Sequence, residues 1–82
     1  MNQKTEYLIK WKQPDGYSPS SVLQQLPSPI SRDMKEIYNY SVESDGFNVI
    51  DRHIDSSVVG HAFKLFLDEA LKYSESVEIR KK

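Results

Sequence analysis

Residues that could bind a metal ion gather between positions 51 and 55 of this 82-residue chain. Asp51, His53 and Asp55 alternate, so a β-strand would point all three side chains to one face. Two carboxylates and an imidazole are ligands for a divalent cation, and His61 could add a fourth. Asp55, however, precedes an amphipathic segment and is better suited to capping a helix. We therefore predict no metal site and no cofactor.

Serine chemistry is the second possibility in the same region. Ser56 and Ser57 lie close in the sequence to His53 and Asp51, as a nucleophile lies close to its base. Nucleophilic catalysis also needs a base within hydrogen-bond distance and an oxyanion site. The chain offers neither a strained nucleophile turn nor a Gly-rich phosphate loop. The serines are typical of a helix start, and we predict that the chain is not an enzyme.

The composition is that of a small globular domain. The chain has no cysteine, which excludes a disulfide framework and a thiolate zinc site. Its formal net charge is −1, so it is not steered as a whole toward nucleic acid. No apolar run is long enough to span a membrane, and the polar start at residues 1–4 is unlike a signal peptide. We expect one cytoplasmic domain over residues 1–82, without a membrane partner.

The elements that position these residues follow from the spacing of apolar side chains. Tyr7, Ile9 and Trp11 alternate as in a strand, whereas Leu8 breaks the alternation. Apolar residues after position 55 recur at helical spacing. The predicted elements are a strand at 6–12, a helix at 18–26, strands at 37–42 and 47–54, a helix at 55–73 and a strand at 77–80.

This order predicts an α+β fold, namely a ferredoxin-like βαββαβ two-layer sandwich. Its four-stranded antiparallel sheet would carry two helices on one face. A two-residue turn at Asp45-Gly46 would pair Val42 with Val49. The side chains expected to meet the helices are those of Tyr7, Ile9, Trp11, Tyr38, Tyr40, Val42, Val49, Val77 and Ile79.

The opposite face of this sheet is the leading candidate site. Its polar side chains include four cations, which could bind phosphate or an acidic partner. A sheet face in contact with water is also commonly polar and mixed in charge, and this alternative remains open. The residues expected there are Lys10, Lys12, Asn39, Ser41, Asn48, Ile50, Arg52 and Arg80.

Two short segments are similar to known families. Residues 45–52 resemble the third strand of an RNA-recognition motif, in which aromatic side chains stack on bases. Phe47 stands at one such aromatic position, whereas Val49 and Asp45 replace an aromatic and a basic residue. The turn at 14–17 is similar to that of ACT domains, which implies a small ligand near the first strand-to-helix connection.

The outer face of the second helix is a further candidate surface. Val58 and Leu65 are seven residues apart, so they share one side of a helix. We expect this side to face water, opposite the apolar stripe. Two exposed apolar residues at this spacing would form a docking stripe for a partner.

These observations predict a small non-enzymatic interaction module that binds a protein partner or self-associates as a homodimer. One alternative is a nucleic-acid-binding domain that uses the open sheet face like an RNA-recognition motif. Another is a small-ligand regulatory domain. The predicted binding residues are Lys10, Lys12, Asn39, Arg52, Arg80, Val58 and Leu65.

Overall fold

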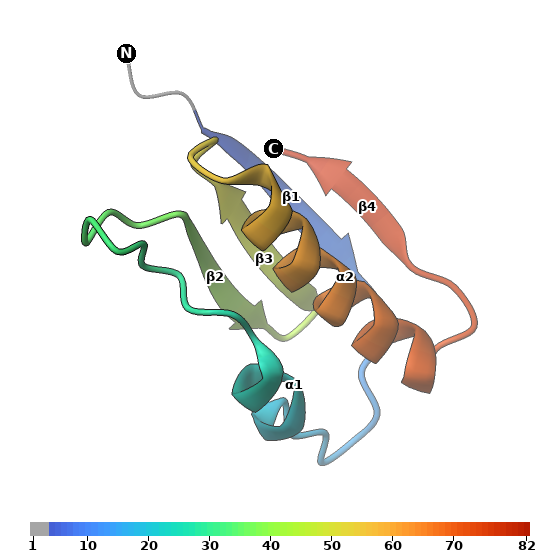
Figure 1. The fold of residues 1–82 in the computed structure, drawn as a ribbon. Coiled ribbons are helices and arrows are strands. Elements are labelled where there is room, and N and C mark those ends of the chain that lie inside the picture. The colour runs from blue at the N-terminus through green and yellow to red at the C-terminus, as the bar shows by residue number, and fades with distance from the viewer. Residues whose placement is uncertain (1–3) are drawn as a thin grey trace.

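A computed structural model describes residues 4–82 of the chain (Figure 1). Its strands form one antiparallel sheet in the order β2-β3-β1-β4. The predicted α+β class, with a four-stranded antiparallel sheet and two helices, is confirmed. The elements are β1 (Thr5–Lys10), α1 (Ser20–Gln25), β2 (Tyr38–Glu43), β3 (Gly46–Asp51), α2 (Ser56–Tyr73) and β4 (Glu78–Lys81).

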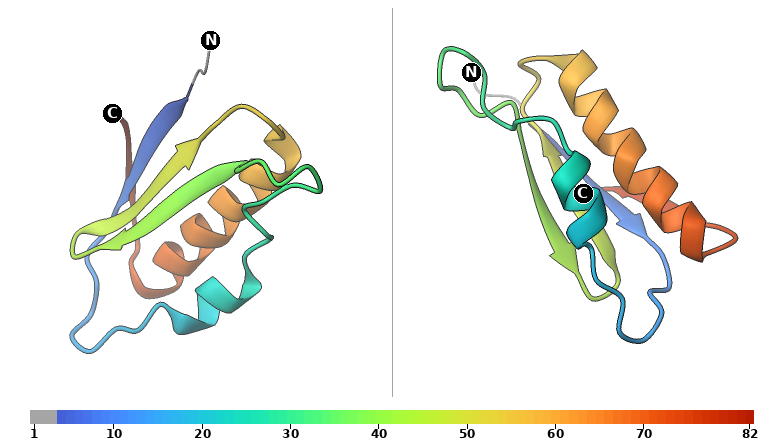
Figure 2. Two further views of the ribbon diagram at one scale, coloured as in Figure 1. Left: turned by 90° about the vertical axis from the view of Figure 1, so that its left-hand side faces the viewer. Right: turned by 60° about the horizontal axis from the view of Figure 1, so that its bottom comes forward.

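The main core lies between the helices and one face of the sheet. Figure 2 shows α1 and α2 on the same side of the strands. Ile9, Phe47 and Val49 of the two central strands are fully buried. They pack in one cluster with Val22 of α1 and Phe66 of α2. Burying each large apolar side chain contributes about 1.5–3 kcal/mol to the stability of the fold. This face of the sheet is therefore part of the core and is not free to bind a partner.

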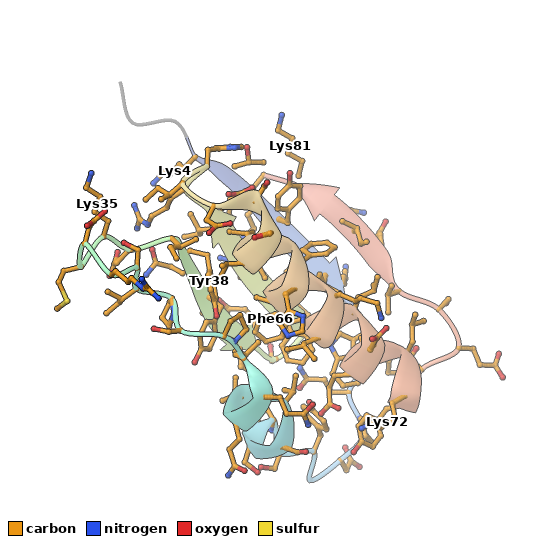
Figure 3. All side chains as sticks on the ribbon, viewed as in Figure 1. Lys4, Lys35, Tyr38, Phe66, Lys72 and Lys81 are labelled. Atoms are coloured by element: carbon orange, nitrogen blue, oxygen red, sulfur yellow. The ribbon has the colours of Figure 1, made fainter. Side chains whose placement is uncertain are left out.

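A second buried cluster lies where β2 meets the first half of α2. It contains Ile37, Tyr38, Val59 and Ala62, all at most 5% exposed. Burial raises the pKa of Tyr38 to about 12, and the nearby Tyr40 adds to the effect. In Figure 3, Tyr38 lies over β2 beside α2, and the labelled lysines lie toward the periphery.

Helix α2 begins where the sequence predicts. The Asp55 side chain accepts hydrogen bonds from the backbone N–H groups of Ser57 and Val58. These donors have no partner inside the helix, which is why a cap stabilises the first turn. The predicted apolar stripe faces the sheet, and Phe66 and Ala70 are fully buried.

The predicted hairpin register is wrong by two residues. Val42 pairs with Phe47, not with Val49, because the two turn residues are Ser44 and Asp45. Gly46 is instead the first residue of β3. A side chain at Gly46 would collide with the backbone carbonyl of Ile9, which explains why glycine lies in the strand. Because the shift is even, every side chain keeps its expected face.

Candidate functional site

The face of the sheet that points away from the helices carries the residues that alternate with the core positions. Cross-strand pairing arranges them in three rows. Lys10, Asn39 and Arg80, which the sequence predicts as binding residues, all lie on this face. From β2 toward β4, the rows are Asn39–Ile50–Glu6, Ser41–Asn48–Leu8–Arg80 and Glu43–Gly46–Lys10–Glu78.

The centre of this open face is partly apolar. Leu8 and Ile50 are half-buried, and Asn48 between them is only 8% exposed. The Asn48 side-chain nitrogen donates a hydrogen bond of 2.8 Å to Glu6, whereas its Oδ1 has no partner among residues 4–82. The predicted site did not include Leu8. The sequence does indicate Leu8, because it is an apolar residue at a position of β1 where alternation predicts a polar one.

The cations on the β4 side of the open face lie next to carboxylates. An Arg80 guanidinium nitrogen lies 3.1 Å from Glu78 Oε1, and Lys82 Nζ lies 3.7 Å from Glu6 Oε1. The hydrogen bond and charge of Arg80, with a smaller effect of Lys10, hold the pKa of Glu78 below its usual value. Such exposed pairs contribute little to stability, but they make the surface mixed in sign.

Arg52 lies at the far end of the same face. Its Nε donates a hydrogen bond of 2.5 Å to Asn39 Oδ1, and its Nη2 lies 3.5 Å from Glu36 Oε2. Lys10 pairs with Gly46, six positions along β3 from Arg52. At about 3.3 Å per residue, the backbone positions of Lys10 and Arg52 are about 20 Å apart. The structure therefore puts them on one face without bringing them together.

Lys12 stands apart from this arrangement. It lies two residues beyond the end of β1 and is exposed. The backbone N–H of the preceding Trp11 donates to Asp45 in the hairpin turn, and the sheet pairing of β1 ends at Lys10. Lys12 therefore belongs to none of the three rows.

The expectation that Val58 and Leu65 face water is wrong. Both are half-buried, Val58 against the cluster around Tyr38 and Leu65 against the main core. Helix α1 contacts α2 and contributes Val22 to the cluster against which Leu65 packs, whereas Val58 packs with Ile37 and Tyr38. The same flank holds Glu69, which accepts a hydrogen bond of 2.7 Å from the Tyr17 hydroxyl. These residues hold the helical layer together and offer no free stripe.

Asp51, His53 and Asp55 form hydrogen bonds with other groups of the protein. Asp51 accepts a hydrogen bond of 2.8 Å from the His53 backbone, and the His53 ring lies 2.8 Å from the Thr5 hydroxyl. Asp55 is used as the helix cap, and His61 is exposed on α2. Within residues 4–82, no three His, Asp or Glu side chains are placed to hold a metal ion.

A shallow pocket of about 280 Å³ opens beside the first half of α2. It lies at the opposite end of β1 from the turn at 14–17, where a small-ligand site is expected. In that turn region, the Tyr17 ring instead packs on Trp11 and its hydroxyl binds Glu69. The pocket is lined by Tyr7, Asp51, Ser56, Val59, Gly60 and Phe63.

Neither helix of the described chain is both long and apolar enough to cross a membrane. Comparisons with known proteins give no further assignment, since no protein family, curated protein or solved structure matches this chain.

Proposed function

We propose that the chain is a non-enzymatic interaction module whose protein partner contacts the open face of the sheet. The observation that carries this proposal is the half-buried apolar centre at Leu8 and Ile50 within a border of both charge signs. Protein interfaces combine an apolar centre with a polar rim in this way.

A nucleic acid fits this face less well. Binding to phosphates depends on cations that replace the counterions of the backbone. Here Arg52 and Arg80 each lie within 3.5 Å of a carboxylate oxygen. Lys10 and Arg52 stand about 20 Å apart along the sheet. A protein surface with its own alternating charges complements this pattern better than a uniformly anionic strand does.

We also infer a ferredoxin-like arrangement. The order of the six elements and the strand order β2-β3-β1-β4 both support it. In this arrangement the first and last strands of the chain lie next to each other, and one sheet face stays uncovered. The uncovered face is the one assigned here to the partner.

The pocket beside α2 supports a second candidate, a small-ligand regulatory role. Its volume of about 280 Å³ is near the lower limit for small-molecule sites. A metabolite that binds only the folded chain would raise its Tm. A Gly60→Leu variant would fill the pocket, so a shift seen in the wild type and lost in this variant would favour this candidate.

The leading proposal is tested by comparing which proteins the wild type and two variants retain. Ile50→Lys places a charge in the apolar centre of the open face. Lys64→Glu, on the exposed side of α2, is the matched control. We expect the wild type and Lys64→Glu to retain the same partner, and Ile50→Lys to lose it while unfolding at a similar temperature. Retention of that partner by Ile50→Lys would contradict the proposal.

A further inference from the structure

The outer edge of β4 is open for pairing with another strand. The Lys82 backbone N–H donates to the Glu6 carbonyl at 2.8 Å, so residues 78, 80 and 82 direct their backbone groups toward β1. Antiparallel alternation then turns the N–H and C=O groups of Ile79 and Lys81 outward. All four β4 residues are exposed, and Ile79 is 46% exposed. Figure 1 shows β4 at the margin of the sheet, beyond α2.

The other edge of the sheet, along β2, is partly covered. The Ile37 backbone N–H donates a hydrogen bond of 2.6 Å to the Pro29 carbonyl. The Tyr38 hydroxyl donates to the Pro27 carbonyl, and Tyr38 is fully buried. The connection from α1 therefore runs along the start of β2. Of the two sheet edges formed by residues 4–82, β4 is the one whose residues are all exposed.

We propose, on the basis of the proposed interaction role, that β4 pairs antiparallel with β4 of a second copy, about a two-fold axis through Ile79. In this register, Glu78 lies opposite Arg80 of the partner subunit, and Arg80 opposite Glu78 of the partner subunit. Opposite charges at directly facing positions stabilise a strand pair. The two Ile79 side chains meet on the helix side of the sheet. Such an interface is isologous and closes as a dimer.

Charge and the direction of the backbone groups select this register over its neighbours. Axes through positions 78 and 80 would join backbone groups that already bond to β1. An axis through position 81, whose backbone groups do point outward, would place Lys81 directly opposite its own copy. Like charges directly opposite each other destabilise the pair. A two-fold axis between two adjacent residues would place the outward backbone groups of one copy opposite residues of the other copy whose backbone groups point toward β1. The register centred on Ile79 is thus the one that joins free backbone groups and opposite charges.

The pairing would extend the proposed binding surface. The sheets of the two copies would become one continuous sheet, with the two open faces side by side. Leu8 pairs with Arg80 across β1 and β4, so Leu8 of each copy lies one strand away from the junction and Ile50 lies two strands away. A partner protein would then meet a surface twice as wide as that of one chain.

Single charge reversals and their mixture test the register. Glu78→Arg alone and Arg80→Glu alone create two like-charge pairs per dimer. Each should raise the dimer dissociation constant about tenfold or more, measured by analytical ultracentrifugation. An equimolar mixture of the two variants should recover the dimer, because each Arg then faces a Glu. Lys35→Glu, in the connection between α1 and β2, is the matched control and should dimerise like the wild type.

Circular dichroism checks that each variant is folded. The swapped double variant Glu78→Arg/Arg80→Glu again places each Arg opposite a Glu, so it should dimerise. A dimer that tolerates both single reversals, or a mixture that stays monomeric, would overturn the β4 pairing. A wild type that is monomeric at every concentration would also overturn it. If Ile50→Lys then still loses a captured partner, the proposed interaction role stands without the dimer.

Discussion

At the scale of single residues, two glycines differ in whether their surroundings leave room for a side chain. Gly46 has a φ of 156°, and an added Cβ would strike the backbone of Ile9 and Lys10. Gly60, inside α2, has no atom within 4 Å of the corresponding position. The first glycine is required by a close approach of two strands, whereas the second costs helix stability without a packing reason.

Substitution of the two glycines should therefore act in opposite directions. Gly46→Ala should lower the free energy of unfolding by about 1–3 kcal/mol, because backbone atoms must shift to accommodate the methyl group. Gly60→Ala should raise it by about 0.5–1 kcal/mol, because alanine restricts the unfolded chain and favours the helix. Urea denaturation monitored by circular dichroism measures both. A neutral Gly46→Ala would show that β3 approaches β1 less closely than described.

The Asp55 cap predicts a pH dependence. Hydrogen bonds from the Ser57 hydroxyl and the Val58 backbone lower the pKa of Asp55 below its usual value of 3.8. Because the folded pKa is the lower one, the cap stabilises the fold above pH 3.8 and loses this effect as the pH falls through the folded value. Asp55→Asn keeps a capping oxygen without a titrating group. Urea midpoints of the wild type should fall more steeply in this acid range than those of Asp55→Asn, and parallel curves would contradict the account.

At the scale of elements, a buried hydrogen bond ties the connection before α1 to α2. The Tyr17 hydroxyl donates to Glu69, which is 4% exposed, and burial together with this hydrogen bond raises the pKa of Tyr17. Tyr17→Phe leaves the buried carboxylate without this donor and should lower the free energy of unfolding by about 1–3 kcal/mol. Tyr73→Phe, in the same aromatic cluster, keeps the bond and should be close to neutral in the same denaturation experiment.

The sequence is informative for elements with a strong local signal. The alternation in β1, β2 and β3 and the cap and stripe of α2 predict the elements and the faces of their side chains. The hairpin register is not predicted, because an Asp-Gly pair favours a turn but cannot reveal that Gly46 is needed against Ile9. The burial of Val58 and Leu65 is also missed, since helical spacing shows which residues share a flank without showing what packs against that flank.

At the scale of the whole molecule, the two helices lie on the same side of the sheet. The helices cover one face, and the other face carries a partly apolar centre and charges of both signs. The placement of Lys10, Asn39, Arg52 and Arg80 on this face follows from alternation alone. The separation of Lys10 from Arg52 and the pairing of Arg52 with Glu36 do not, because these depend on the register between distant segments.

The account rests on contact through the sheet and its β4 edge. The most direct measurement is a concentration series of amide NMR spectra with hydrogen exchange, in which Lys82, whose N–H is already bonded to Glu6, is the internal reference. We expect the amides of Ile79 and Lys81 to shift and to exchange more slowly as the concentration rises, while Lys82 stays protected throughout. Unchanged Ile79 and Lys81 amides, with shifts instead at exposed α2 residues such as His61 and Lys64, would contradict the account.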